Sequence, residues 1–469
     1  MPEPPIEDRL RRELGLFDTT MIVAGSVIGV GIFTTSGLVA AALPDPIWLL
    51  VAWLLGGLIS AAGALTNAEM GASLPHAGGD YVYLREAFHP LVGFFAGWLT
   101  FFVVYCGTVG TLAAGLAEYL AVFSESLAPD RLWVAAGPFR LGPAQATSLV
   151  AVWGCTLLCW SGLREGARFQ NLVTLAKVAA LALVCLAGPL IGVGEWSRIL
   201  EAAPVDGAPL HGIGLVTGVG VAMVPILFTY LGWNAPIYIA SELREPARTL
   251  PRALVVGTAL VTALYLLINV VYLYAVPVGE MYSIASDGSR AGVVRIAESA
   301  STALFGAVGG QLAAGLVLVS IVGCLNATIL VGARIVYAMA LDRTLPPGLA
   351  SVHPERFTPD IALLAQALVA SLLLVTGSFD AILTYTTFAV ITLMVLDGLA
   401  LFRLRQRPDL ERPWETWGYP WVPAVYVAAS LGLWVNTLLE RPVESGLGLL
   451  IAATAFPAYW LARLRSRRV

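Results

Sequence analysis

The chain contains a single lysine, Lys177, and it lies within a long apolar segment. All the other members of the 27 basic residues are arginines. A charged side chain near the centre of a membrane-spanning helix costs about 2.5–3.5 kcal/mol on insertion scales. Lys177 is roughly 10 Å from the nearer end of its segment, so its stem reaches only part of the way to an interface. Snorkelling and a buried ammonium with a function are the two interpretations, and lysine, unlike arginine, can release its proton when buried.

A second candidate feature is the glycine-rich stretch GSVIGVGIF at residues 25–33. Gly25, Gly29 and Gly31, mixed with β-branched residues, make a poor continuous helix. Small residues also allow membrane helices to pack closely, but that alternative predicts a spacing of four, as between Gly25 and Gly29. The extra Gly31 favours local unwinding around Ser26 and Gly29.

A similar interruption is predicted about two hundred residues later. Pro225 and Pro236 remove backbone donors on either side of Tyr230, Gly232, Trp233 and Asn234, and glycine and asparagine tolerate unusual dihedral angles. Unwound backbone at membrane depth survives only where it faces protein or a water-filled cavity. Free N–H groups begin the second half of a broken helix and free C=O groups end the first half. Such groups can hold the carboxylate and ammonium of an α-amino acid, and paired broken helices are typical of secondary transporters.

The composition requires that these segments lie in a membrane. Of the 469 residues, 58% are apolar and 12% are charged, and the mean hydropathy is +0.80. A soluble domain is about 45–50% apolar and about 25% charged, so a soluble enzyme is excluded. Twelve segments are long and apolar enough to span the bilayer. They are 16–42, 47–68, 91–123, 146–162, 170–192, 213–239, 252–276, 308–340, 361–378, 380–404, 421–438 and 446–464.

Arginine distribution predicts the orientation. With a cytoplasmic N-terminus, 20 arginines lie in inner segments and 6 in outer ones, as the positive-inside rule requires. The outer six are Arg131, Arg140, Arg198, Arg290, Arg295 and Arg441. We therefore expect a multi-pass protein of the inner or plasma membrane, with cytoplasmic segments at 1–15 and 465–469.

Other polar residues receive simpler interpretations. Asp397 is expected to form an ion pair with Arg403 or Arg405 at the inner surface, and Glu118 to be hydrated near the outer end of its span. Tyr105 and Asn326 are candidate pocket residues by depth alone. His76, His89, His211 and His353 fall between the spans, and Cys155 and Cys159 lack a redox or zinc spacing, so no metal and no cofactor are expected.

In order along the chain, several stretches resemble the amino acid–polyamine–organocation (APC) transporters, most closely their L-type and bacterial neutral amino acid branch. They are GSVIGVGIF at 25–33, AEMG at 68–71, PHAGGDYVYLREAF at 75–88, FFAGW at 94–98, NLVTLAK at 171–177, FTYLGWN at 228–234, SELREPARTLP at 241–251, the stretch 325–346, RPDLERP at 407–413 and WGYP at 417–420. The resemblance implies an all-α fold with twelve transmembrane helices in a five-plus-five inverted repeat of the leucine-transporter type. The first repeat would cover 16–192, the second 213–404, and two peripheral helices 419–464, with helices one and six broken.

The resemblance also implies roles for individual residues. The N–H groups of Val30 and Gly31 would hold the substrate carboxylate. The carbonyls of Val27, Phe228 and Leu231 would hold its α-ammonium, and Phe228 would cover the substrate as an outer gate. The ammonium of Lys177 would stand where sodium-coupled relatives bind a cation, so sodium independence is implied.

Two departures from the family pattern bear on the substrate. Val30 replaces the usual serine and so removes a hydroxyl, and Leu231 stands where relatives often have glycine or aspartate. If Leu231 points inward, smaller neutral substrates are favoured. A cationic substrate is not favoured, because the interrupted stretches 25–33 and 225–236 contain no acidic residue. Animal L-type exchangers bind a glycoprotein through a cysteine between spans three and four. Residues 124–143 contain none, so no disulfide-linked accessory subunit is expected.

The sequence thus predicts a transporter of neutral L-amino acids that works by alternating access, as an exchanger or by proton-linked uptake, and not an enzyme. Two alternatives stay open. One is a carrier of cationic amino acids or polyamines within the same superfamily, and the other is an amino acid sensor that binds without transport.

Overall fold

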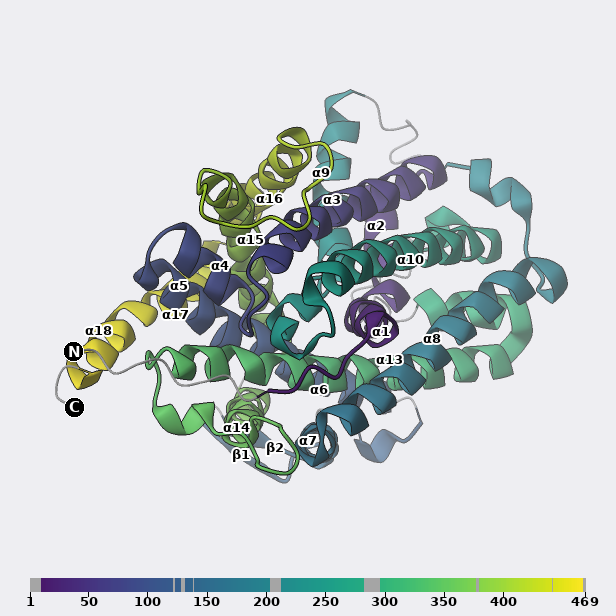
Figure 1. Cartoon of the computed structure of the whole chain (residues 1–469). Helices are drawn as coiled ribbons and strands as arrows, with labels where there is room; N and C mark the ends of the chain where they lie inside the picture. The colour runs from purple at the N-terminus through teal and green to yellow at the C-terminus, as the bar shows by residue number, and fades with distance from the viewer. Residues whose placement is uncertain are drawn as a thin grey trace.

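The computed structural model describes residues 10–120, 123–127, 131–137, 139–202, 212–281, 296–376, 379–440 and 442–466. This part of the chain is almost entirely helical (Figure 1). Its only sheet is a hairpin of β1 (Val134–Ala136) and β2 (Phe139–Leu141), in which Val134 lies opposite Leu141. Residues 1–9 and 467–469, which include most of the predicted cytoplasmic termini, lie outside the described residues.

The helices follow one another in this order: α1 (Leu16–Val27), η1 (Gly31–Phe33), α2 (Thr35–Ala42), α3 (Pro46–Ser73), α4 (Asp80–Ala87), α5 (Pro90–Trp98), the π-helical η2 (Leu99–Tyr105), α6 (Cys106–Leu120), η3 (Glu125–Leu127), α7 (Pro143–Ser161), α8 (Leu163–Ile191), η4 (Trp196–Leu200), α9 (Ile213–Tyr230), η5 (Ala235–Tyr238), η6 (Ala240–Glu242), α10 (Pro246–Ala275), α13 (Ile296–Leu341), η7 (Pro347–Ala350), α14 (Asp360–Thr376), α15 (Phe379–Leu404), α16 (Trp421–Glu440), α17 (Pro442–Ala453) and α18 (Ala455–Ser466).

Within the described ranges, nine helices are long and apolar enough to cross a membrane. The difference from the twelve predicted segments has local causes. Segment 16–42 is divided into α1, η1 and α2, and α14 has only 17 residues. Segment 146–162 corresponds to α7, which has 19 residues but does not count among the nine. The structure therefore describes a polytopic all-helical membrane protein, and its number of spans is considered below.

Helix starts follow ordinary capping chemistry. At the start of α3, the Asp45 side chain accepts hydrogen bonds from the backbone N–H groups of Ile47 and Trp48, and Pro46 occupies the first helical position. An aspartate cap followed by proline satisfies donors that the helix itself leaves free. This cap fixes where α3, the first of the long helices, begins.

The short helix α1 lies at the centre of the molecule, where Figure 1 shows it almost end-on. It packs against α8, α10 and α13. On α8, Leu172, Leu175 and Leu183 are more than half exposed, whereas Lys177 on the same helix is completely buried. An apolar exposed face is expected where a helix meets lipid, so α8 separates the lipid from α1.

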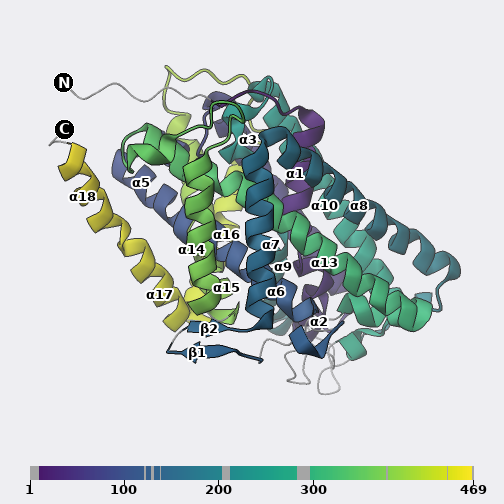
Figure 2. The ribbon, with the colours of Figure 1, turned by 90° about the horizontal axis from the view of Figure 1, so that it is seen from below.

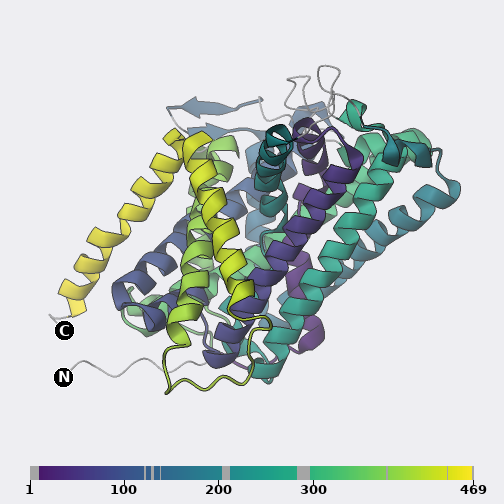
Figure 3. The ribbon, with the colours of Figure 1, turned by 90° about the horizontal axis from the view of Figure 1, so that it is seen from above.

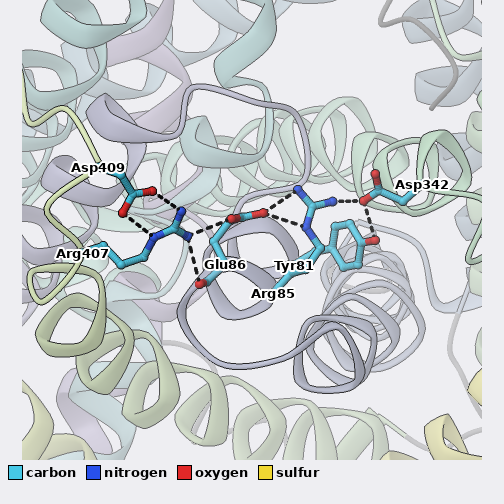
Figure 4. Close-up of polar contacts among 6 residues, drawn as sticks. All are labelled: Tyr81, Arg85, Glu86, Asp342, Arg407 and Asp409. Atoms are coloured by element: carbon cyan, nitrogen blue, oxygen red, sulfur yellow. Dashed lines mark hydrogen bonds and ion pairs between the residues drawn. The ribbon is translucent and has the colours of Figure 1, made fainter. Parts of the chain in front are cut away.

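The two ends of the bundle differ. Figures 2 and 3 show the β1–β2 hairpin and α2 at one end, and the start of α1, the linker between α15 and α16 and the C-terminal end of α18 at the other. We call the second the terminal end. A chain of alternating charges runs from Asp342, which follows α13, through Arg85 and Glu86 of α4 to Arg407 and Asp409 of the α15–α16 linker (Figure 4). It connects α4 both to the end of α13 and to the α15–α16 linker.

Two further ion pairs at depth join distant segments. Arg334 of α13 contacts Glu242 of η6 through two hydrogen bonds of 2.7 and 3.1 Å, and both side chains are almost completely buried. Arg405, just after α15, binds Glu69 of α3 through two hydrogen bonds of 2.7 Å each. A bidentate guanidinium–carboxylate pair is directional, so these contacts set the positions of α13 and α15 relative to the first part of the chain.

Arg334→Met is expected to destabilise the protein by about 3–5 kcal/mol, because it leaves the buried Glu242 carboxylate without its guanidinium. The matched control is Arg248→Met, which removes an ion pair of 3.5 Å whose two side chains are about three-quarters exposed. We expect the control to change stability by less than about 1 kcal/mol. Thermal unfolding of detergent-purified protein measures both, and equal melting temperatures for the two variants would contradict this account.

Candidate functional site

The first apolar segment is interrupted at its glycines. α1 ends at Val27, residues Ile28–Val30 are not helical, and the chain resumes as η1 and then α2. The Thr34 hydroxyl donates to the Gly31 carbonyl at 3.1 Å, which holds the turn between η1 and α2. An interruption of this kind leaves the last carbonyls of α1 and the first N–H groups of η1 without helical partners.

The second interruption follows α9. This helix ends at Tyr230, Leu231 is extended with a ψ of 147°, and Gly232 has a φ of 103°. Only glycine adopts such a positive φ without strain. The chain then continues as the short 3-10 helices η5 and η6 rather than as a continuation of α9.

The two interruptions are in direct contact. A Cβ atom built on Gly232 would lie 2.9 Å from the Ser26 carbonyl oxygen, and one built on Gly31 would lie 2.7 Å from the Thr229 hydroxyl. Neither distance leaves space for a side chain. The absence of a side chain therefore lets Gly232 lie against the backbone of Ser26 at the end of α1, and lets Gly31 lie against the Thr229 side chain at the end of α9.

The backbone carbonyls at the end of α1 accept hydrogen bonds from other groups of the protein. The carbonyl of Ala24 accepts from the Ile28 N–H, and that of Ser26 from the Cys324 thiol at 3.2 Å. The Val27 carbonyl accepts both the Gly29 N–H at 2.7 Å and a tyrosine hydroxyl. The two remaining carbonyls, of Gly25 and Ile28, accept from Lys177.

Lys177 extends from α8 into the interruption. Its Nζ atom donates to the Gly25 carbonyl at 2.8 Å and to the Ile28 carbonyl at 2.7 Å, and the side chain is 0% exposed. The ammonium therefore does not snorkel to an interface. A Cβ atom at Gly25 would lie 2.0 Å from the amide nitrogen of Gln170 and 2.4 Å from the Thr174 hydroxyl, both on α8. Gly25 thus lets α1 and α8 approach closely enough for the lysine to reach.

Three polar contacts that the sequence did not indicate join the two halves of the chain at this point. The Tyr265 hydroxyl of α10 lies 2.9 Å from the Val27 carbonyl and 3.3 Å from the Thr229 carbonyl. Thr229 is also bonded to Thr35 of α2 at 2.8 Å. The hydroxyl of Ser36 donates to Asn269 of α10 at 2.6 Å. A lone tyrosine in an apolar span gives no periodic signal, and only its depth could have drawn attention to it.

Some peptide groups of the interruptions are still available to a ligand. The Val30 N–H donates to no other described residue, and the Gly31 N–H begins η1, where helices leave their N–H groups free. The Leu231 carbonyl likewise accepts no hydrogen bond from the described part of the chain. A donor region and an acceptor region thus lie on two segments that touch each other.

A cavity of about 90 Å³ adjoins the interruptions. Ser26, Leu231 and Gly232 contribute to its wall, so Leu231 does reach the cavity. The wall also includes Trp233 and Asn234, but not Val27, Val30, Gly31 or Phe228. The lining residues are Ser26, Asp80, Val104, Tyr105, Thr108, Leu231, Gly232, Trp233, Asn234, Ala235, Tyr238, Cys324, Thr328, Val390, Leu393, Met394 and Asp397.

Of the candidates chosen by depth alone, Tyr105 lines the cavity and Asn326 does not. The Asn326 amide donates to Gln170 at 3.0 Å and to the Gly166 carbonyl at 3.3 Å, both on α8. Asn326 therefore joins α13 to α8, which is the usual role of asparagine between membrane helices. The Glu118 side chain lies outside the described residues.

The expectation for Asp397 was wrong. Arg405 binds Glu69, and Asp397 is 2% exposed and interacts electrostatically with Asp80, which is 1% exposed. Both carboxyls line the cavity. Asp397 was judged by its neighbours in the sequence, whereas its contact in the fold comes from α4, more than three hundred residues earlier.

Among the described residues, no group of three or more histidine, cysteine, aspartate or glutamate side chains could hold a metal ion. The five cysteines are free, and Cys324 lines the cavity. The chemistry available at this site is therefore recognition by peptide groups, one ammonium and two carboxyls.

Comparison with known proteins gives matches over nearly the whole length. The family model described as "Amino acid permease" matches residues 14–456. The chain is 29% identical over 457 residues to the serine/threonine exchanger SteT of Bacillus subtilis, with 97% of each chain covered. It is 30% identical over 457 residues to the large neutral amino acids transporter small subunit 2 of Homo sapiens, covering 96% of this chain and 80% of that protein. It is 29% identical over 466 residues to the Asc-type amino acid transporter 1 of Mus musculus, covering 96% and 81%.

Lys177→Met is expected to lower the melting temperature of the ligand-free protein. The substitution keeps the apolar stem but leaves the buried Gly25 and Ile28 carbonyls without a donor, at a cost of about 1–3 kcal/mol for each. Leu175→Met, on the exposed face of the same helix, is the matched control and should have no effect. A Lys177→Met protein that melts at the wild-type temperature would show that the end of α1 does not depend on the ammonium.

Proposed function

The chain belongs to the amino acid permease family of the APC superfamily, and from this premise we propose that it is a sodium-independent secondary transporter of neutral L-amino acids. It is a multi-pass membrane transporter and not an enzyme. Its substrates would cross by alternating access, either in exchange for one another or linked to a proton. The single observation that carries this proposal is the contact between two interrupted helices that still offer free peptide groups.

The free groups suit a zwitterion. The carboxylate of an amino acid would bind the N–H groups of Val30 and Gly31, where the start of a helix carries a partial positive charge. Its ammonium would bind carbonyls at the other interruption. The Val27 carbonyl already accepts two hydrogen bonds, and that of Phe228 accepts the Leu231 N–H. The Leu231 carbonyl is therefore the strongest candidate acceptor of the three that the family resemblance implies.

Sodium independence would follow from Lys177. A cation is attracted to the carbonyls that end a half-helix, and sodium-coupled members of the superfamily use a metal ion there. In this chain an ammonium already donates to the Gly25 and Ile28 carbonyls. Because this ammonium is covalently part of the protein, no sodium gradient would be needed to supply a cation at this position.

We extend the proposal to the topology. Twelve spans would result if α1 with α2, α7 and α14 cross the membrane together with the nine long helices. The segments 16–192 and 213–404 would be the two inverted repeats, and residues 419–464 the two peripheral helices. The terminal end, with residues 1–15 and 465–469, would face the cytoplasm of an inner or plasma membrane.

The cavity favours a small side chain. Leu231 contributes to its wall, its volume is about 90 Å³, and Val30 lacks the hydroxyl of the usual serine. Substrates of the size of alanine, serine or threonine would fit better than aromatic ones. The absence of cysteine from residues 124–143 supports a transporter that works without a disulfide-linked subunit.

A second candidate is a carrier of cationic amino acids or polyamines. The argument against it considered only acidic residues within the broken helices, but Asp80 and Asp397 reach the cavity from α4 and α15. If these carboxyl groups were ionised, they would attract the additional positive charge of a cationic amino acid or a polyamine. A sensor that binds amino acids without moving them is the remaining alternative, since every contact described above would serve binding equally well.

Purified protein in liposomes separates these functions. We expect uptake of labelled alanine or serine only when the liposomes contain unlabelled neutral amino acid or a proton gradient is applied, with equal rates in sodium and choline buffers. Arginine and putrescine should compete poorly. Strong competition by arginine would favour the cationic carrier. Binding that raises the melting temperature, without uptake under either condition, would favour the sensor.

Phe228→Ala is expected to weaken substrate binding by roughly tenfold, about 1.4 kcal/mol, because its partly buried ring would cover the bound amino acid. The matched control is Val221→Ala, a truncation of an exposed apolar residue on the same helix α9, and it should leave binding unchanged. The concentration for half-maximal counterflow measures the effect. An unchanged value in Phe228→Ala, with normal melting behaviour, would remove Phe228 from the gate.

A further inference from the structure

Two acidic side chains meet in the interior without a cation. Asp80 is the first residue of α4 and Asp397 lies in α15, and these two helices pack against each other. The carboxyls are 1% and 2% exposed, line the same cavity and lie close enough to interact electrostatically. Two carboxylates have only acceptors, so a hydrogen bond between them requires a proton on one of them.

The remaining partners of the pair account for one oxygen only. The Tyr238 hydroxyl donates to Asp80 Oδ2 at 2.5 Å. The Oδ1 atoms of Asp80 and Asp397 are both buried, and neither has a hydrogen-bond partner among the described residues. Both side chains face the cavity beside the interrupted helices. A proton on one carboxyl would supply a donor that the buried pair lacks, and the unpartnered Oδ1 atoms are an observation separate from the acidity of the pair.

No neighbouring cation neutralises the two carboxyls in place of a proton, as the described groups around them show. Four tyrosines of the surrounding elements interact electrostatically with the pair, Tyr83 in α4, Tyr105 in η2, Tyr238 in η5 and Tyr426 in α16, and of these only Tyr238 donates a hydrogen bond to it. On the helices packed against α4 and α15, Glu69 and Arg405 are paired with each other, and Arg85 pairs with Glu86 and Asp342. No described arginine or lysine acts on either carboxyl.

We propose that Asp80 and Asp397 form a proton-binding site that holds one shared proton while α4 and α15 are together, and that releases it when they separate. The inference rests on the proposed transport function, in which the terminal end must close and open. The charge chain of Figure 4 connects α4 to α13 and to the α15–α16 linker. Movement of α15 away from α4 would therefore both open the cavity toward the terminal end and break the contact between the carboxyls.

The pH dependence follows from this coupling. Burial raises the pKa of Asp80 to about 6, outweighing the lowering effects of Tyr238 and Asp397. An exposed aspartate has a pKa of about 4. The closed arrangement is thus fully favoured below about pH 4 and loses its advantage as the pH rises through about 6. Transport that must pass through the closed arrangement becomes slower at alkaline pH.

The test is counterflow of a labelled neutral amino acid in liposomes with equal pH on both sides, from about pH 5.5 to about pH 8. We expect the wild-type rate to fall about threefold or more over this range. Asp397→Asn and Asp80→Asn supply an amide donor that needs no proton, so their profiles should be nearly flat. Asp45→Asn is the matched control, because asparagine also caps helices well, and its profile should match the wild type.

A flat wild-type profile, or Asn variants that keep the full wild-type slope, would overturn the proposal. So would a sodium dependence that disappears in Asp397→Asn, since that assigns the pair to a metal cation. If no counterflow occurs at any pH, the proposed function fails, and the melting temperature still tests the pair. It should fall more steeply in the wild type than in Asp397→Asn as the pH rises from about 4 to about 6, and equal slopes would refute the shared proton.

Discussion

The arrangement depends on the peptide groups that an interrupted helix leaves unsatisfied inside an apolar environment. Carbonyls at the end of α1 cannot bond to water at membrane depth, and each costs free energy if it is left without a donor. The chain supplies those donors from four directions: the peptide itself, a thiol, the hydroxyl of Tyr265 and the ammonium of Lys177. The N–H groups after the interruption receive no comparable partners from the described residues, and this asymmetry is the basis for proposing that an anion binds at this end.

The close packing around the interruption follows from the same constraint. Lys177 can reach the carbonyls only because Gly25 lets α8 approach α1, and the two unwound segments can touch only because Gly232 and Gly31 have no side chains. Tyr265 then contacts carbonyls of both segments at once. Displacement of either interrupted helix would disturb the hydrogen bonds of the other, which provides a physical route for coupling two halves of a transporter.

The sequence predicted those parts of the site that have a chemical signature of their own. A single lysine in an apolar span and three glycines within seven residues are unusual in themselves, so Lys177 and the region of Gly29 could be selected without a structure. Tyr265 and the Asp80–Asp397 pair could not, because their contacts join residues more than two hundred positions apart. Asp397 was misjudged for the same reason: nearby arginines in the sequence suggested a partner, but Arg405 binds Glu69. The sequence predicted twelve spans, whereas nine helices of the described residues are long and apolar enough to cross a membrane. The three other segments correspond to α1 with α2, to α7 and to the 17-residue α14.

The central claim is that free peptide groups at two touching interruptions hold the substrate. Amide hydrogen exchange, measured by mass spectrometry with and without a bound neutral amino acid, tests it most directly, because it reports on those N–H groups themselves. The account predicts slower exchange in peptides that cover residues 28–34 and 230–235 when alanine or serine is bound. Unchanged exchange in both regions, with protection at another part of the molecule, would contradict it.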